Sequence, residues 1–394
     1  MNLPNKRDIK NILIIADRIH AMPRMTTLAE EFKKHGKKVE IYSFSNENEA
    51  KHTLSHVEKK ENIFKKLLRK ITFFRSIFGL ISYLISYPDE YFYKWYLKKK
   101  IEIDNLILNF QPDIVISSSS PISAHLIAYR VCTKFNIKWC ADFRDMWSLN
   151  HNHKGKFIGK YLDGLIEKKI LTAANVITTT TPMWAETLSK YYGREVHSIT
   201  NGFCENKYKL QPNRKIENRV IRYSGTIYEE MQKKTFDKFL KAISMLNDKT
   251  ITFEIYGPTS SWIKDRIRAN NLEDQALVIG PIDNKLIANI QMTSSLNVIF
   301  GCNHSGFIDG YYLKMFEYIG ARRPILFVSD ERYEEASAVL LRDFPNTYEA
   351  SSVEEIAMKI KLSLHEDYLN PDSSILESYT FRKLANDYMR IIEN

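Results

Sequence analysis

The sequence predicts an α/β protein made of two doubly wound units, and three observations support this. Short apolar runs rich in β-branched residues alternate with amphipathic stretches, as in parallel strands covered by helices. A polar stretch between Cys204 and Arg219 interrupts the alternation, and a second series follows it. The 394 residues are also too many for one ordinary core. We therefore expect two domains facing each other across a cleft, 1–203 and 204–376, with a C-terminal helix in 377–394 packing back on the first.

The first half alternates between strand and helix in order. Residues 11–16 form a short apolar run that predicts a buried strand, and a helix with Leu28, Ala29 and Phe32 on one face follows it, ending at Gly36. The expected strands are 11–16, 39–43, 113–117, 138–141, 175–179 and 196–200, and the expected helices are 25–35, 123–135 and 162–173.

The second half repeats the pattern after the linker. The expected strands are 220–223, 250–256, 277–279, 295–300 and 324–328, with helices at 235–246 and 381–392. In such sheets, ligands bind beyond the carboxyl ends of the strands. Residues 16–20 follow the first strand without a GxGxxG, and no GxxxxGK[ST] is present, so nicotinamide, flavin and P-loop chemistry are disfavoured. We expect no cofactor and, since no DxD follows a strand, no metal.

The composition narrows the class of protein further. With 44% hydrophobic residues and 12 prolines the chain is globular. Lys and Arg total 57 against 47 Asp and Glu, and the net charge of +10 favours anionic partners, although a genomic bias toward lysine explains it equally well. The four cysteines lack metal-ligand spacing and the polar start is not a signal peptide, so we expect a reducing, cytoplasmic location. No nucleic-acid-binding motif is present.

The most informative segment begins at Asp309, a loop residue followed eight positions later by Glu317 in a short helix. Lys314 shares a helix face with Glu317 and lies in the first turn, where free N–H groups favour phosphate. We expect this helix to end at Gly320. The pattern predicts a nucleotide-sugar site in which Lys314 meets phosphate, Glu317 binds ribose hydroxyls and Asp309 binds the sugar. An N-capping Asp309 and a charged helix face are the alternative.

Three turns that follow strands, at 223–228, 256–258 and 280–282, should lie at the same edge of the second sheet. Gly225 lies in a turn between a strand and a helix, where the backbone can approach a ligand closely. Lys233 and Lys234, further along that helix, either reach a diphosphate or are solvated lysines. The candidate donor-binding residues are Gly225, Thr226, Tyr228, Lys233, Tyr256, Gly257, Ile282, Lys314 and Glu317.

The first half carries a polar cluster at residues 142–147, directly after an apolar strand. Asp142, Arg144 and Asp145 with Trp147 predict a functional loop at the sheet edge; an Asp–Arg pair that ties the loop down is the alternative. We also expect Ser123 to be the N-cap of the helix that follows residues 117–120.

These segments resemble the GT-B glycosyltransferases of family 4, whose signature is Glu, seven residues, Glu. Asp309 stands at the first position and Glu317 at the second, and residues 314–326 are similar to the form found in bacterial capsule and O-antigen transferases. The stretches 142–147, 117–125 and 199–203 match as well. The family's Gly-Arg-x5-Lys-Gly stretch is absent, and residues 223–234 stand in its place.

The resemblance implies transfer of a sugar from a nucleotide-sugar to a glycan or polyprenyl-linked acceptor in bacterial surface polysaccharide synthesis, with retention of configuration. It implies a donor site in the second half and an acceptor site in the first. A catalytically inactive scaffold subunit and a nucleotide-sugar 2-epimerase are the alternatives. The catalytic candidates are Asp142, Arg144, Asp145 and Asp309, and the acceptor-binding candidates are Arg24, Ser120, His125 and Trp147.

One segment, 71–87, could contact a membrane. It is apolar but carries Arg75 and falls short of the roughly 20 residues that a span needs. Basic residues flank it within 65–100, so an in-plane helix on the inner membrane face is one interpretation and a buried helix is the other.

Overall fold

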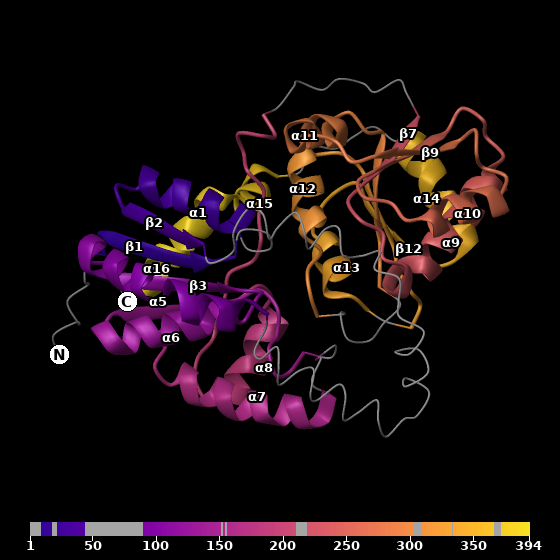
Figure 1. Cartoon of the computed structure of the whole chain (residues 1–394). Coiled ribbons are helices and arrows are strands. Elements are labelled where there is room, and N and C mark those ends of the chain that lie inside the picture. The colour runs from indigo at the N-terminus through magenta and orange to yellow at the C-terminus, as the bar shows by residue number, and fades with distance from the viewer. Residues whose placement is uncertain are drawn as a thin grey trace. The chain divides into compact units, whose positions relative to one another are not determined.

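The structure is a computed structural model, and it describes residues 9–17, 22–43, 90–150, 153, 156–209, 219–302, 309–332, 334–365 and 372–394. The described chain divides into two compact units. Unit 1 contains Met1–Thr200 and Leu384–Asn394, and unit 2 contains Asn201–Lys383 (Figure 1). The predicted membrane segment 71–87 lies outside the described residues.

Unit 1 is built on a parallel six-stranded sheet with the order β2-β1-β3-β4-β5-β6. The chain runs outward from β1 to β2 and then returns to β3 on the other side of β1. The topological switch point, where such sheets bind ligands, therefore lies between β1 and β3. The strands are β1 (Asn11–Ala16), β2 (Lys38–Ser43), β3 (Ile114–Ser119), β4 (Lys138–Phe143), β5 (Val176–Thr179) and β6 (His197–Ser198).

The helices of unit 1 cover this sheet, and the last one comes from the far end of the chain. They are α1 (Met22–Lys34), α5 (Glu90–Phe110), α6 (Ser123–Phe135), α7 (Lys156–Leu171), α8 (Pro182–Tyr192) and α16 (Phe381–Glu393). The strongly amphipathic α16 buries Leu384, Ala385, Tyr388, Met389 and Ile392. Phe32 of α1 meets Tyr388 edge-on, with ring centroids 6.2 Å apart.

Unit 2 repeats the architecture with the strand order β12-β11-β10-β7-β8-β9, again all parallel. Its switch point lies between β7 and β10. The strands are β7 (Val220–Ser224), β8 (Thr252–Tyr256), β9 (Ala276–Gly280), β10 (Leu296–Phe300), β11 (Ile325–Val328) and β12 (Thr347–Ala350). The helices are α9 (Glu229–Leu246), α10 (Ser261–Ala269), α11 (Asn284–Met292), α12 (Leu313–Ala321), α13 (Ala336–Leu341), α14 (Val353–His365) and α15 (Ser373–Glu377).

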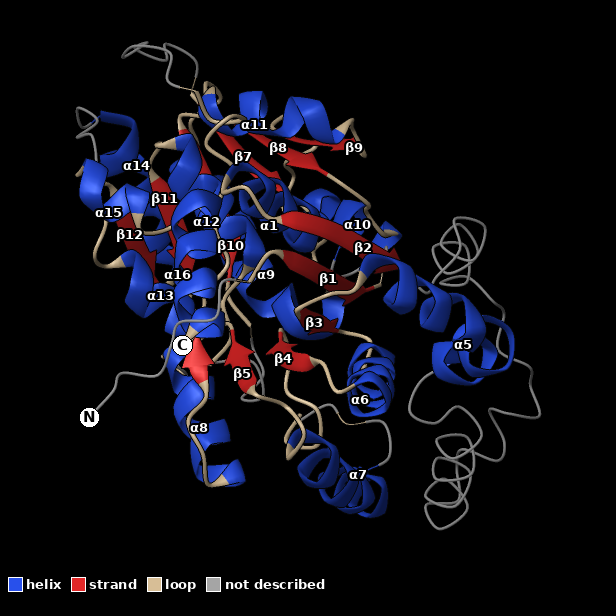
Figure 2. Ribbon diagram, turned by 90° about the vertical axis from the view of Figure 1, so that its left-hand side faces the viewer, coloured by secondary structure: helices blue, strands red, loops and turns tan. Residues whose placement is uncertain are grey.

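Two cores lie on the opposite faces of the second sheet. Alternate residues of β10 point to each side: Leu296, Val298 and Phe300 join the core that contains α9 and α14, whereas Ile299 joins the core that contains α12 and α13. Figure 2 shows helices on both sides of the strands. The predicted α/β fold with two doubly wound units is confirmed.

Several predicted boundaries differ from the structure. The helix expected at 162–173 is α7, Lys156–Leu171, and the helix expected at 235–246 begins six residues earlier, at Glu229. The N-cap of α6 is Ile122 rather than Ser123, which is already helical and buried. The helices α5, α8, α10, α11, α13, α14 and α15 and the strand β12 were not predicted. None of the described helices is both long and apolar enough to cross a membrane.

Candidate functional site

The helix α12 carries Lys314 and Glu317 to the carboxyl end of β7, at the switch point of unit 2. The Lys314 ammonium donates to the hydroxyl of Tyr223 and lies 3.8 Å from the centroid of that ring. A Cβ atom placed on Gly225 would stand 3.0 Å from the Lys314 Nζ. The structure thus brings together two segments that are about ninety positions apart in the sequence, as expected for these residues.

Burial lowers the pKa of Lys314 to about 7, although the nearby Glu317 carboxylate opposes the shift. Near neutral pH the ammonium is therefore only partly charged in the ligand-free protein. A diphosphate bound beside it would favour the protonated form, because an opposite charge at close range stabilises the ammonium. This makes Lys314 a group that can take up a proton when an anion binds.

The Glu317 carboxylate is held in a buried polar network. Gln291 of α11 donates to Glu317 Oε2 at 3.1 Å and to the Ser224 hydroxyl at 2.8 Å, and Tyr208 donates to the Gln291 Oε1 at 2.6 Å. Tyr318 accepts from the Ser224 backbone N–H at 2.9 Å. Burial raises the pKa of Glu317, against the opposing effects of the Gln291 hydrogen bond and the Lys314 charge. The network fixes the orientation of a half-buried carboxylate that keeps capacity for further hydrogen bonds.

The turns after β7 and β8 are crowded backbone that only glycine fits. Gly225 and Gly257 have φ values of +130° and +127°. A Cβ atom on Gly257 would lie 2.5 Å from the Gly225 carbonyl oxygen, and the Gly225 N–H donates to the Tyr256 carbonyl at 2.7 Å. The two turns are therefore packed against each other, and a ligand at this edge would meet bare backbone.

Asp309 lies in the chain before α12 and is half-buried. The N-cap of α12 is Tyr312, which makes no side-chain cap bond, so Asp309 is not the N-cap. Within the described residues Asp309 has no hydrogen bond or ion pair. Its proposed role in binding the sugar stays a prediction.

Gly320 does not end α12 as expected. The helix continues to Ala321 and is followed by Arg322 in the left-handed conformation, with φ +53°. Gly320 is instead a close-packing position, because a Cβ there would lie 2.7 Å from the Phe203 ring. Close packing against Phe203, and not the end of the helix, therefore explains the glycine at this position.

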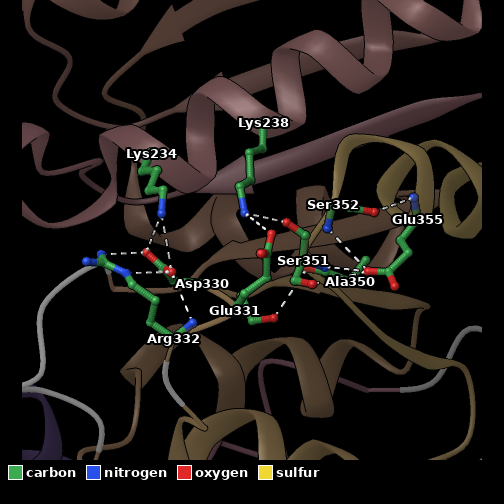
Figure 3. Close-up of polar contacts among 10 residues, drawn as sticks. Lys234, Lys238, Asp330, Glu331, Arg332, Ala350, Ser351, Ser352 and Glu355 are labelled. Carbon is green, nitrogen blue, oxygen red and sulfur yellow. Dashed lines mark hydrogen bonds and ion pairs between the residues drawn. The ribbon is translucent and has the colours of Figure 1, made fainter.

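The lysines of α9 already have protein partners. Lys233 pairs with Glu229 on the exposed face of the helix, with Nζ 2.7 Å from Oε1. Lys234 lies 3.4 Å from Asp330, a carboxylate with no exposed side-chain surface that is also 2.9 Å from Arg332 (Figure 3). The pKa of Asp330 is lowered to about 2, mainly by the side-chain hydrogen bonds that Arg332 donates to it. Lys238 bonds Glu331 and the Ser351 carbonyl. In this structure these side chains tie α9 to the loops after β11 and β12.

The other donor candidates lie around the same edge with different exposure. The Thr226 carbonyl accepts from Tyr223 at 2.8 Å, and Tyr228 is 58% exposed at the N-cap of α9. Tyr256 donates to Glu254, and Ile282 is half-buried in the loop after β9. Of these, the exposed Tyr228 ring is the one available to stack on a base.

In unit 1, Asp142 is the centre of a closed cluster on one face of the sheet. Its oxygens accept from Ser118 at 2.8 Å, from Thr178 at 2.9 Å and from Tyr388 of α16, and Arg24 lies 3.5 Å away. Asp142 has no exposed surface. Arg24 also donates to the carbonyls of Thr200 and Ile199, so the cluster joins α1, the sheet edge and the C-terminal helix. These contacts favour a positioning role for Asp142 and Arg24.

The opposite face of the same sheet edge carries polar atoms without partners. Ser119 and Thr179 flank Phe143 in register, and the hydroxyls of both are buried without a hydrogen bond to any described residue. The His125 ring lies 4.4 Å from Phe143, and its Nε2 is unpartnered as well, whereas Nδ1 is 2.8 Å from the Ser117 hydroxyl. Burial lowers the pKa of His125 to about 3, so its ring is neutral. All three side chains have no exposed surface, so these atoms lie inside unit 1 and not on a surface open to a ligand.

The remaining first-half candidates divide by burial. Trp147 is 4% exposed and packs in the core of unit 1, so its side chain is not on a ligand-facing surface here. Ser120, Arg144 and Asp145 are half-buried. Burial and the nearby Arg24 charge lower the pKa of Arg144, against the carboxylates of Asp145 and Asp142.

Residues that the sequence did not single out complete both sites. Gln291 donates to Glu317 and to the Ser224 hydroxyl, and Tyr388 donates to Asp142. Gln291 lies on an unpredicted helix and Tyr388 lies 246 positions from Asp142, so no local pattern could reveal them. A strand that ends in four serines, 117–120, was the one visible signal on the unit 1 edge.

Comparisons with known proteins identify the fold. A sequence-family model described as Glycosyltransferase Family 4 matches residues 24–206, just under half of the chain. HepE from Anabaena, solved in complex with UDP and glucose, is 12% identical with a TM-score of 0.66, covering 97% of this chain and 99% of its own. The chain has the GT-B fold.

Other GT-B structures are similar at comparable distance. The lipopolysaccharide outer core galactosyltransferase WaaB is 12% identical with a TM-score of 0.53, over 96% of this chain and 99% of that one. The UDP-GlcNAc 2-epimerase from Methanocaldococcus jannaschii is 12% identical with a TM-score of 0.58, over 98% and 99%. No curated protein matches the sequence. The resemblance to family 4 GT-B glycosyltransferases is confirmed, and these identities show the fold alone.

Proposed function

We propose that the protein is a glycosyltransferase that takes a sugar from a nucleotide-sugar bound to unit 2. The pairing of Lys314 with Glu317 on α12 carries this proposal, because it places a cation and an oriented carboxylate beside the glycine turn at the switch point. Phosphate oxygens need donors and a cation, and ribose hydroxyls need an acceptor. The structure solved with UDP and glucose, HepE, makes UDP-sugars the first donors to test.

The proposed reaction breaks the bond between the anomeric carbon and the diphosphate oxygen and forms a bond from that carbon to an acceptor hydroxyl. Negative charge grows on the leaving diphosphate, where the α12 N-terminus and Lys314 stabilise it. We propose retention of configuration and metal independence, with the acceptor proton leaving on the departing phosphate. Asp309 would bind the transferred sugar. If configuration is inverted instead, Asp145 is the candidate base, since Asp142 is enclosed.

The acceptor is proposed to be a glycan or a polyprenyl-linked glycan of bacterial surface polysaccharide, bound by unit 1. Support comes from half-buried polar side chains at the carboxyl edge of its sheet. Ser120, Arg144 and Asp145 are the nearby half-buried candidates. We propose a cytoplasmic protein that attaches peripherally to the inner membrane face, where such acceptors are built.

The test is a panel of nucleotide-sugars, screened first by thermal shift because a bound donor stabilises by mass action. Donors that bind are then incubated with lipid-linked glycan acceptors, and release of nucleoside diphosphate is measured. Acceptor-dependent release supports the proposal, and EDTA should leave it unchanged. Conversion of the donor without any acceptor would identify a 2-epimerase, and neither binding nor turnover would indicate an inactive scaffold. Asp145→Asn should lower turnover while donor affinity stays the same.

A further inference from the structure

The N-terminal part of α7 carries an apolar stripe that is exposed rather than buried. A surface helix normally buries its apolar stripe and exposes its charges, as α9 does with Phe236, Phe239 and Leu240. In the N-terminal part of α7 four apolar side chains are exposed, whereas Ile166, Ile170 and Leu171 pack in the core of unit 1. Ile158, Tyr161, Leu162 and Leu165 are 56, 65, 39 and 53% exposed. Their spacing of three and four residues puts them on one stripe, which we call the α7 outer face.

The acidic residues of α7 face inward and are bonded there. Asp163 is 2.7 Å from the Nε2 of His153, and Glu167 accepts from the Ser148 N–H at 3.1 Å and from the Tyr192 hydroxyl. Both carboxylates are almost fully buried. These bonds fix the orientation of α7 about its own axis. The apolar stripe is therefore held on the outer side of the helix.

Gly164 allows close packing of α7 against α8, which also fixes the orientation of α7 about its axis. A Cβ atom on Gly164 would lie 2.6 Å from the Tyr191 hydroxyl of α8 and 3.6 Å from the Ser148 hydroxyl. The helix therefore approaches α8 too closely to turn without a clash. In Figures 1 and 2 α7 lies at the periphery of unit 1.

The charges that α7 exposes are all positive. Lys168 and Lys169 are exposed in its last turn, with the Lys168 ammonium 4.0 Å over the Tyr191 ring, and Lys160 is half-buried. Among the described side chains of α7, the carboxylates are the buried pair already named. An apolar stripe bordered only by lysines fits the boundary of an anionic leaflet, where apolar groups enter the acyl layer and ammonium groups meet lipid phosphates. Single exposed apolar residues are ordinary, but four on adjacent turns form a patch.

We propose that the α7 outer face docks unit 1 on an anionic lipid surface, lying in the plane of the headgroups. This deepens the peripheral attachment in the proposed function and assigns it to a helix other than the 71–87 segment. It also orients unit 1, since α7 and the sheet edge are joined rigidly through Ser148 and α8.

The experiment uses the full chain and sedimentation with vesicles, without any nucleotide-sugar, so its result is independent of transfer activity. Wild type should bind phosphatidylcholine–phosphatidylglycerol vesicles, with weaker binding at high salt, and bind phosphatidylcholine alone poorly. Tyr161→Ser/Leu165→Ser should lower the partition coefficient about tenfold or more. Met245→Ser/Leu286→Ser, which changes two equally exposed apolar residues of unit 2, should bind as wild type.

A second pair of variants tests the charge. Lys168→Glu/Lys169→Glu should abolish the preference for phosphatidylglycerol, whereas Lys241→Glu/Lys361→Glu, exposed on other helices, should weaken it far less. Melting temperatures verify that each variant is folded. Equal binding by wild type and Tyr161→Ser/Leu165→Ser, or no binding by wild type to either vesicle, overturns the proposal. A wild-type dimer in light scattering that this variant dissociates would assign the face to a second copy instead.

Discussion

Asp142 in unit 1 and Glu317 in unit 2 are both carboxylates near the carboxyl edge of a parallel sheet, yet their surroundings differ. Asp142 is wholly buried and accepts from Ser118, Thr178 and Tyr388 beside Arg24. Glu317 is half-buried, accepts a hydrogen bond from Gln291 alone within the described part of the chain, and has a pKa raised by burial. The first is surrounded by protein donors, and the second keeps acceptor capacity for a ligand.

The comparison teaches that a polar cluster at a sheet edge can serve either structure or binding, and that satisfaction of hydrogen bonds tells them apart. A carboxylate with several buried donors holds elements together, here the sheet and α16. A carboxylate oriented by one donor, beside a lysine whose pKa is lowered to about 7, is prepared for a partner that is not part of the chain. Substitutions at both carboxylates and at their neighbours test this distinction.

Asp142→Ala should destabilise unit 1 by about 4 kcal/mol, because it leaves Arg24 and three hydroxyls without their acceptor in a buried site. Urea unfolding followed by tryptophan fluorescence measures this, since four of the five tryptophans lie before residue 200. Glu102→Gln, at an exposed position of unit 1, is the control and should change stability little. A loss below about 1 kcal/mol would contradict the positioning role.

Glu317→Ala should weaken nucleotide-sugar binding about 100-fold, since it removes a charged acceptor for two hydroxyls while the fold keeps its Gln291–Ser224 bond. Calorimetric titration with the donor found by thermal shift gives the dissociation constant. Glu273→Ala, on the exposed surface of unit 2, should bind like wild type. Unchanged affinity in Glu317→Ala would remove α12 from the donor site.

Donor affinity should fall as pH rises above about 7, by up to about tenfold per pH unit. The sign follows from the lowered pKa of Lys314: above 7 the free protein has lost this proton, and the diphosphate must restore it. Below 7 the lysine is charged in both states and the dependence should flatten. Titration in buffers of different ionisation enthalpy detects the proton uptake. Lys314→Met should bind more weakly at every pH and lose this dependence.

Gln291→Met should weaken donor binding about tenfold, because the isosteric side chain fills the space yet cannot hold Glu317 Oε2. The dissociation constant measures the effect, and a double-mutant cycle with Glu317→Ala separates orientation from packing. If Gln291 acts through Glu317, the two losses should not add. Additive losses would show that Gln291 acts independently.

Lys233→Met should change donor affinity by less than about twofold, since its ammonium is paired with Glu229 on the exposed face of α9, an interaction worth about 0.3–0.5 kcal/mol. The same titration measures it. A tenfold loss would show that Lys233 leaves Glu229 to meet the diphosphate, as the sequence allowed.

The sequence by itself determined the strand and helix alternation, and with it the α/β fold. A short apolar run such as Ile12–Ile15 predicts a buried strand, and the run can be recognised from neighbouring residues alone. It also placed Lys314 and Glu317 on one helix face, because a separation of three residues along a helix has a single geometry.

Only the tertiary structure decided which polar residues are enclosed. Asp142, Trp147 and Arg24 read as functional residues by type, but α16 and the core bury them. The role of Gly320 and the partners of Lys234 likewise depend on Phe203 and Asp330, far away along the chain. Whether a side chain is buried, and which groups it bonds, depends on contacts between segments that are distant in the sequence. A local sequence pattern does not contain these contacts.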